Sequence, residues 1–177
     1  TAYEITRWLE FRRVLFRSKR FVDAVKEMKA TLDVQVQHEA SAGLAAADII
    51  ITTTPSKDPL VFSHQVKPGA HINAIGADAP GKQELDSVLI KDAYIVVDDV
   101  TQASHSGEIN VPLVQNIIQP DHIQATLPEI VSGLTPIQKS ERVSVFDSTG
   151  LAIQDIVAGA YIFNKAKEKQ VGQWIQL

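Results

Sequence analysis

Small and polar residues follow apolar runs at three places in the chain, where their side chains could bind a ligand or move a proton. The segments are Thr52–Pro55, Asn73–Lys82 and Asp147–Gly150. If the apolar runs are parallel strands, the segments that follow them meet at the carboxyl edge of one sheet. Ligands of open α/β sheets bind at that edge, near the point where the strand order reverses. We therefore take these segments as the candidate site.

The first two segments each allow a structural and a functional interpretation. The hydroxyls and amides of Thr52 and Thr53 could lie beside a dinucleotide, or they could simply end a strand that Pro55 closes. The small residues after Asn73 would let a flat ring approach the backbone. Asp78 and Lys82 add an acid and a base four positions apart. The alternative is a surface turn in which Asp78 caps the next segment.

The third segment, Asp147–Gly150, precedes a long amphipathic stretch that we expect to be a helix. Asp, Ser and Thr are common helix caps, since their side chains accept hydrogen bonds from the free amides of the first turn. The same helix start could face a cofactor or an anionic group of a substrate. The two interpretations are compatible.

The elements that would position these segments alternate along the chain. We expect strands at residues 14–16, 34–36, 48–54, 70–75, 94–97 and 143–146. We expect helices at residues 2–11, 21–28, 39–47, 86–90, 101–104, 111–116, 127–133 and 151–169. Strands that are continuous apolar runs and alternate with helices are typical of a parallel sheet covered on both faces. The pattern predicts an α/β fold with a doubly wound, mostly parallel sheet.

The composition narrows the class of protein. The 177 residues are 45% hydrophobic and 21% charged, with a net charge of −4 and no long block of one sign. We therefore expect no nucleic-acid partner and no membrane partner. The chain has no cysteine, which excludes disulfides and thiolate metal sites and fits a cytoplasmic protein. The five histidines show no metal-ligand spacing, so we expect no metal.

Several motifs together resemble the ornithine cyclodeaminase/mu-crystallin family, which includes archaeal-type alanine dehydrogenases and ketimine reductases. The matching residues are Thr52–Pro55, His71–Asp78, Pro80–Leu85, Val97–Asp99, Gly107–Ile109 and Phe146–Ala152. The resemblance covers essentially the whole chain and is densest from residue 48 to residue 165. The loop at residues 76–86 is most similar to the alanine dehydrogenase branch.

The resemblance implies a Rossmann-type fold, a nicotinamide dinucleotide (NAD or NADP) and a role for each loop. Asp78 would be the catalytic residue, exchanging a proton with the amine of a substrate that Thr149 also contacts. The residues implied to bind the cofactor are Thr52, Thr53, Ile75, Gly76, Ala77, Lys82 and Ser148. Lys82 could instead be a solvated loop lysine. Burial would raise the pKa of Asp78 and a substrate ammonium would lower it, so we expect a modest net shift.

Preference between the two cofactors depends on the residues after the family's second strand, which corresponds here to the strand expected at residues 14–16. An acid there would bind the ribose hydroxyls of NAD. The chain has Arg17, Ser18 and Lys19 instead. Because two cations and a hydroxyl suit a 2′-phosphate, these residues favour NADP, with Arg17 and Ser18 as further cofactor contacts.

The resemblance also implies that parts of the protein lie ahead of Thr1. These are the first strand with its glycine-rich phosphate turn, and an amino-terminal domain that binds the substrate carboxylate and forms much of a homodimer interface. Residues 1–150 would then be an incomplete NAD(P)-binding Rossmann-type domain. Residues 151–177 would be a helix and tail that pack toward the absent domain.

The expected function is an NAD(P)-dependent amine or imine redox enzyme acting on a small amino acid or a cyclic imine. Alanine dehydrogenase, ketimine reductase and ornithine cyclodeaminase activities all need the same acid and cofactor. The alternatives are a non-catalytic, NADPH-dependent small-molecule binding protein of mu-crystallin type, and an inactive fragment.

Overall fold

The computed structural model describes residues 18–28, 33–37, 39–137, 141–173 and 175. Contacts within the chain divide it into two compact units, residues 1–43 and residues 44–177. The helix expected at residues 2–11, the strand expected at 14–16 and Arg17 lie outside the described residues.

In the first unit, residues 18–28 form the expected helix. Residues 33–37 have no regular secondary structure, so the strand predicted around Val34 and Val36 is wrong. A strand is held by hydrogen bonds to a neighbouring strand. Apolar and polar residues alternate here as they do in a strand, but no described strand pairs with these residues.

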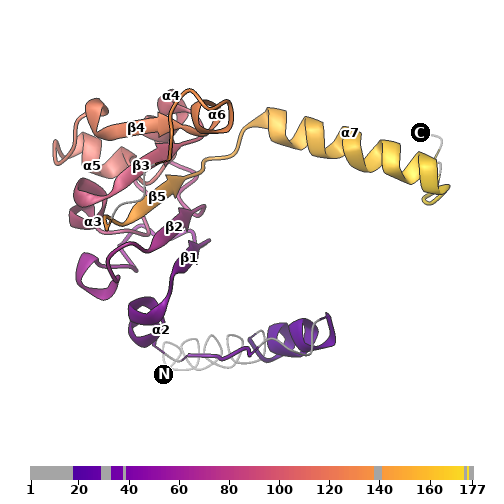
Figure 1. The fold of residues 1–177 in the computed structure, drawn as a ribbon, viewed down its shortest axis with the longest axis horizontal. Helices are drawn as coiled ribbons and strands as arrows, with labels where there is room; N and C mark the ends of the chain where they lie inside the picture. The colour runs from indigo at the N-terminus through magenta and orange to yellow at the C-terminus, as the bar shows by residue number, and fades with distance from the viewer. Residues whose placement is uncertain (1–17, 29–32, 38, 138–140, 174, 176–177) are drawn as a thin grey trace, which may run out of the picture. The chain divides into compact units, whose positions relative to one another are not determined.

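The second unit contains a parallel sheet, which Figure 1 shows with its helices. Its strands are β1 Ile49–Thr52, β2 His71–Ala74, β3 Tyr94–Val97, β4 Ile123–Thr126 and β5 Ser144–Asp147. Their order across the sheet is β1-β2-β5-β3-β4, and every pairing is parallel. The last strand of the chain therefore lies at the centre, between β2 and β3. The predicted parallel α/β fold is confirmed.

The helices follow the expected pattern closely. They are α2 Ala40–Ala46, α3 Ser87–Asp92, α4 Val100–Ser106, α5 Asn110–Val114, α6 Leu127–Val131 and α7 Ala152–Lys169, with 3-10 turns at Ser63–Gln65 and Pro120–His122. Strand β4 was not expected, because this edge strand carries Gln124 and Thr126 and lacks an apolar run. No described helix is long and apolar enough to cross a membrane.

The core lies on one face of the sheet, because alternate residues of each strand point to opposite faces. Ile72 of β2, Ile95 of β3 and Val145 of β5 are fully or almost fully buried there. They belong to one apolar cluster with side chains of α2, α3 and α4 and of the segments beside α5, among them Leu44, Leu89, Ile90, Ala103, Ile109 and Ile118. Packing in this cluster holds the strands in place and so positions the loops that follow them.

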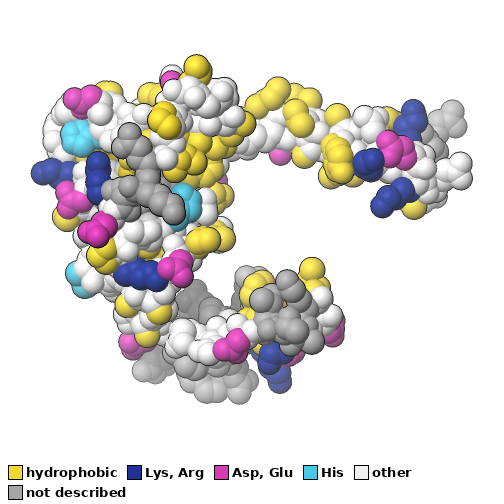
Figure 2. Space-filling model, in the orientation of Figure 1, with side chains coloured by type: hydrophobic (Ala, Val, Ile, Leu, Met, Phe, Trp, Pro, Cys, Tyr) yellow, Lys and Arg dark blue, Asp and Glu magenta, His cyan; other side chains and the backbone are white. Residues whose placement is uncertain are grey.

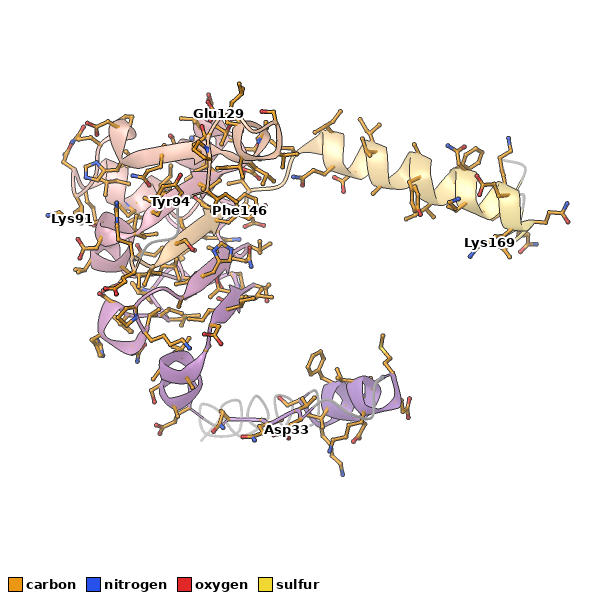
Figure 3. All side chains as sticks on the ribbon, viewed as in Figure 1. Asp33, Lys91, Tyr94, Glu129, Phe146 and Lys169 are labelled. Atoms are coloured by element: carbon orange, nitrogen blue, oxygen red, sulfur yellow. The ribbon has the colours of Figure 1, made fainter. Side chains whose placement is uncertain are left out.

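The opposite face of the sheet is partly open. Residues of β2, β3, β5 and α6 line a cavity of about 620 Å³ there, among them His71, Asn73, Tyr94, Val96, Leu127, Ile130 and Phe146. Tyr94 and Phe146 are labelled in Figure 3. Of the three segments taken as the candidate site, only Asn73 lines this cavity, and none of the residues implied to bind cofactor or substrate does.

Helix α7 is the longest helix of the second unit, and its apolar side chains are exposed. Figure 2 shows hydrophobic side chains along it. They include Ile153, Ile156, Val157, Tyr161, Ile162 and Phe163, each at least half exposed.

Candidate functional site at the carboxyl edge of the sheet

The strand ends form one row, because the parallel register aligns their last residues. The aligned residues are Thr52, Ala74, Asp147 and Val97. The ladder continues one residue further, where Ile75 N donates to Thr52 O at 3.0 Å and Ser148 N donates to Ala74 O at 3.0 Å. Three of the predicted residues, Thr52, Ile75 and Ser148, therefore lie side by side at this edge.

Thr52 and Ile75 present complementary chemistry at the edge. The Thr52 hydroxyl is buried and has no hydrogen-bond partner within the described part of the chain. Ile75 is 42% exposed and offers an apolar surface, while Ala77 is buried and Thr53 is exposed. A polar atom without a partner next to an exposed apolar side chain is what a ligand with both polar and flat apolar parts requires.

The turn that begins at Gly76 is built around a buried carboxylate. Glu84 is fully buried, and its Oε1 accepts a hydrogen bond from Thr54 N at 2.5 Å. Its Oε2 accepts from Gly76 N at 3.0 Å. A Cβ added at Gly76 would collide with Thr54 O and with Glu84 Oε2. Only glycine fits at this position without a shift of its neighbours.

Asp78 and Lys82 lie at the tip of the same loop. Lys82 Nζ donates to Asp78 Oδ1, and the two side chains are 22% and 64% exposed respectively. The hydrogen bond from Lys82, and then its charge, hold the pKa of Asp78 below its ordinary value. The predicted balance of burial against a substrate ammonium is not what sets this pKa, because Asp78 is exposed and Lys82 is its neighbour.

The far end of the loop is anchored to α5 by Asn110, which is almost fully buried. Asn110 Oδ1 accepts from Gly81 N at 2.9 Å, and Asn110 Nδ2 donates to Lys82 O at 3.1 Å. The loop is therefore fixed at Gly76 and again at Gly81, with Asp78 between the two anchors.

Asp98, at the end of β3, holds the third segment. Its Oδ2 accepts from the amides of Thr149 and Gly150, each at 2.8 Å, and its Oδ1 accepts from Thr149 Oγ1 at 2.9 Å. Ser148 Oγ also donates to Asp98, at 3.3 Å. Ser148 and Thr149 are thus both half-buried and positioned by the same carboxylate.

The interpretation of this segment as a helix cap is wrong. Helix α7 begins at Ala152, and its N-cap residue Leu151 makes no side-chain capping bond. Asp147 is instead the last residue of β5 and is fully buried. Its side chain points into the core layer, where Asp147 Oδ2 accepts a hydrogen bond from Ile109 N at 3.2 Å. It is therefore not available to cap α7.

Two buried acids below the loops favour the protonated form. Burial raises the pKa of Glu108 to about 8, against hydrogen bonds from the amides of Leu85 and Glu84 that lower it. Burial likewise raises the pKa of Asp147 to about 7. The charges of neighbouring carboxylates add to both shifts, Asp147 and Glu84 for Glu108 and Asp98 for Asp147.

Sequence reasoning missed the residues that hold the loops. Glu84, Asp98 and Glu108 appear in the sequence analysis only as members of motifs, and Asn110 does not appear there. The signal for Glu84 was a charged residue directly before an apolar residue, Leu85, that is also fully buried. A burial pattern of this kind is visible only once the fold is known.

Two predictions concern other residues than those of the strand ends. Ser18 and Lys19 belong to the first unit, and Arg17 is outside the described residues. Their role toward a 2′-phosphate stays a prediction. In the parts of the chain that the structure describes, no group of three or more His, Asp or Glu side chains could hold a metal ion.

The fold defines the class of the protein: it is a Rossmann-type, parallel α/β domain. The chain belongs to the ornithine cyclodeaminase/mu-crystallin family, which it matches over residues 12–170.

Relatives in sequence carry out redox chemistry on amino acids and imines. The chain is 44% identical over 160 residues to an alanine dehydrogenase of Archaeoglobus fulgidus, covering 90% of this chain and 48% of the relative. It is 38% identical over 133 residues to the ketimine reductase mu-crystallin of Rattus norvegicus, covering 75% and 40%. The chain thus spans about half the length of the relatives it matches.

Solved structures agree with this assignment. An archaeal alanine dehydrogenase dimer with bound NAD superposes with a TM-score of 0.80 at 42% identity, covering 90% of this chain and 49% of that one. The Thermococcus litoralis Delta(1)-pyrroline-2-carboxylate reductase, in complex with NADH and L-proline, gives a TM-score of 0.82 at 29% identity, covering 89% and 49%.

The residues at the edge fit a nicotinamide dinucleotide. The Thr52 hydroxyl lacks a partner among the described residues, and Gly76 leaves the start of the turn without a side chain. Ile75 supplies an exposed apolar side chain beside both. A flat, amide-bearing ring needs such a combination of an apolar contact and a free hydrogen-bonding group.

Proposed function

We propose that the full-length protein is an NAD(P)-dependent enzyme that interconverts the amine of a small amino acid and the corresponding imine. The observation that carries the proposal is the loop between Gly76 and Lys82, which holds one reachable carboxylate, Asp78, beside the residues that suit a dinucleotide. The named activities of the relatives, alanine dehydrogenase and ketimine reductase, support the same chemistry.

In this proposal Asp78 is the catalytic residue and moves the proton of the substrate nitrogen. A carbon bearing an ammonium group cannot give up hydride until that nitrogen loses a proton. Asp78 is a carboxylate at neutral pH and can accept that proton, and Lys82, which lowers its pKa, makes it a weaker base for as long as the two side chains stay paired. In the reverse direction the protonated acid returns it to the nitrogen.

The neighbouring residues bind and orient. The dinucleotide, when bound, accepts or supplies the hydride. Thr52, Thr53, Ile75, Gly76, Ala77, Lys82 and Ser148 are proposed to hold it at the edge of the sheet. Thr149, positioned by Asp98, is proposed to contact the substrate.

Both cofactors remain candidates in this proposal. The archaeal alanine dehydrogenase structure contains NAD and the Thermococcus litoralis structure contains NADH. Arg17, Ser18 and Lys19 favour NADP on charge alone. A homodimer is proposed for the full-length protein, since the archaeal relative is a dimer.

The test is a substrate and cofactor matrix with the full-length protein. Alanine, ornithine and cyclic imines are assayed with NAD(H) and NADP(H), for the parent and for Asp78→Asn. We expect turnover to fall by about 100-fold or more in the variant, because general acid–base catalysis contributes roughly 10²–10⁴-fold. Turnover by Asp78→Asn equal to that of the parent rejects the proposed role.

The chain offers a matched control for this variant. Asp48 is another exposed carboxylate paired with a lysine, Lys67, at 2.6 Å, but it lies just before β1, at the opposite edge of the sheet. Asp48→Asn should leave turnover unchanged. If the parent binds a dinucleotide and small ligands but turns over none of the substrates, the non-catalytic binding protein is favoured instead.

A further inference from the structure

The Glu84 side chain connects two loops that belong to different strands. Its Oε1 accepts from Thr54 N, beyond the end of β1, and its Oε2 accepts from Gly76 N, beyond the end of β2. Each oxygen thus has its own backbone donor. No other described side chain is hydrogen-bonded to both of these amides.

The turn at Gly76 packs tightly against the Glu84 carboxylate. Glu84 Oε2 lies so close to Gly76 that a methyl group on the glycine would overlap it. The turn and the carboxylate therefore define each other's position. Gly76 and Ala77 directly precede Asp78, so a shift of this turn would move the proposed catalytic carboxylate.

A second buried acid fixes the backbone that carries Glu84. Glu108 Oε1 accepts from Glu84 N at 2.8 Å, and its Oε2 accepts from the amides of Glu84 and Leu85, each at 3.0 Å. Both acids are fully buried. The side chain of Glu84 therefore projects from a held main chain, which limits where its two oxygens can lie.

We propose that Glu84 is a positioning residue of the dinucleotide site, which sets the spacing between the Thr52–Thr54 strand end and the Gly76–Asp78 turn. This inference rests on the proposed function. It adds to it a residue that touches neither substrate nor cofactor and acts through the two amides that it holds.

Glu84 and Glu108 differ in a way that gives a sharp test. In Glu84→Gln one oxygen becomes an NH₂ group, which must then face the N–H of Thr54 or of Gly76, so one of the two bonds is lost. In Glu108→Gln the remaining oxygen can take the place of Oε2, which accepts from both backbone amides, and the new NH₂ group takes the place of Oε1, whose bond to Glu84 N is lost. The same substitution thus leaves one loop amide without an acceptor at Glu84, whereas at Glu108 each of the two amides keeps one.

The experiment compares parent, Glu84→Gln and Glu108→Gln in the full-length protein. Dissociation constants for NAD⁺ and NADP⁺ are measured by calorimetry at a temperature where thermal melts show all three proteins folded. We expect about 10-fold to 100-fold weaker binding in Glu84→Gln, in line with the cost of leaving a backbone amide without its acceptor. Glu108→Gln should bind within about 3-fold of the parent.

A second measurement does not depend on cofactor or activity. Amide hydrogen exchange should accelerate at Thr54 and Gly76 in Glu84→Gln and remain unchanged there in Glu108→Gln. Parent-like exchange and affinity in Glu84→Gln overturn the inference, and so does weakened binding in both variants to the same degree. If the parent itself binds neither cofactor while the exchange result holds, the proposed function fails and the loop-spacing role of Glu84 stands.

Discussion

The carboxyl edge of the sheet has two layers of acidic residues, and they behave in opposite ways. In the outer layer, Asp78 is 64% exposed, and Lys82 lowers its pKa. In the inner layer the acids are buried or almost fully buried: Glu84, Asp98, Glu108 and Asp147. Burial raises the pKa of Glu108 and of Asp147.

The difference suggests separate roles: the outer acid for proton transfer and the inner acids for holding the loops in place. Two of the inner acids hold the loops: Glu84 accepts from the backbone amides of Thr54 and Gly76, and Asp98 accepts from those of Thr149 and Gly150. Asp78 accepts its hydrogen bond from Lys82, whose side chain is 22% exposed and which a ligand could displace. A rigid inner layer and a reachable outer acid are what a proton-transfer site requires.

The largest effect is expected from adding one methyl group between the layers, in Gly76→Ala. The new Cβ would collide with Thr54 O and Glu84 Oε2. We expect a loss of about 3 kcal/mol in the free energy of unfolding, since the buried backbone cannot retreat without breaking its bonds. Denaturant unfolding of the full-length protein measures it.

Gly81→Ala is the control in the same loop. Gly81 has a φ of +77° but open space around it, so its cost is only backbone strain, about 1 kcal/mol. Equal losses in the two variants would mean that the inner layer does not constrain the turn.

The next effect is expected from Asp98→Asn. Each oxygen of Asp98 accepts at least two hydrogen bonds, and Oδ2 holds the amides of Thr149 and Gly150. An amide nitrogen at either position would face N–H donors. We expect about 2 kcal/mol of destabilisation, again by denaturant unfolding.

Asp99→Asn provides the comparison for this variant. Asp99 caps α4 through the single amide of Gln102, at 2.8 Å. Asn caps a helix as well as Asp does, so the change should cost less than about 0.5 kcal/mol. A cost for Asp98→Asn as small as this would show that the segment from Ser148 to Gly150 does not depend on the inner layer.

The inner layer should also make stability depend on pH. The pKa of Glu108 rises from 4.5 to about 8 on folding, so between these values the folded state binds more protons than the unfolded state. The contribution of Glu108 to the free energy of unfolding is therefore fully present below pH 4.5 and is lost as pH rises toward 8. From pH 6 to pH 7 we expect this group to remove about 1 kcal/mol.

Glu108→Gln identifies the group responsible. Gln carries no titrating proton, so unfolding curves recorded from pH 5 to pH 8 should show a flatter slope than in the parent. A slope identical to that of the parent would assign the effect to Asp147 or to another group.

The sequence predicted the sheet and the outer layer better than the inner one. Runs such as Tyr94–Val97 are apolar throughout, so a strand of a parallel sheet could be inferred from residue type alone. Asp78, Ser148 and Thr149 could be placed because they directly follow strands, and parallel strands bring their ends together. The edge strand β4 and the unpaired segment around Val34 show where the pattern fails, since strand pairing is a property of the neighbours.

The inner layer could not be predicted because its residues look like surface residues. Glu84, Asp98 and Glu108 are charged and lie in loops or at element ends, and such residues are mostly exposed. What buries them is their match to backbone amides from distant segments, such as Gly76 for Glu84 and Gly150 for Asp98. The partners are far apart in the sequence, so these pairs cannot be recognised before the order of the strands in the sheet is known.

The smallest effect tests the outer layer alone, in Lys82→Met. The variant removes the hydrogen bond and the charge that lower the pKa of Asp78, so this pKa should rise. If Asp78 must be ionised to accept the substrate proton, the acid limb of the kcat/KM profile for amine oxidation moves to higher pH. Lys67→Met, which breaks the Asp48 ion pair at the opposite edge, should leave the profile in place. An unmoved acid limb in Lys82→Met would mean that the group controlling the rate is not Asp78.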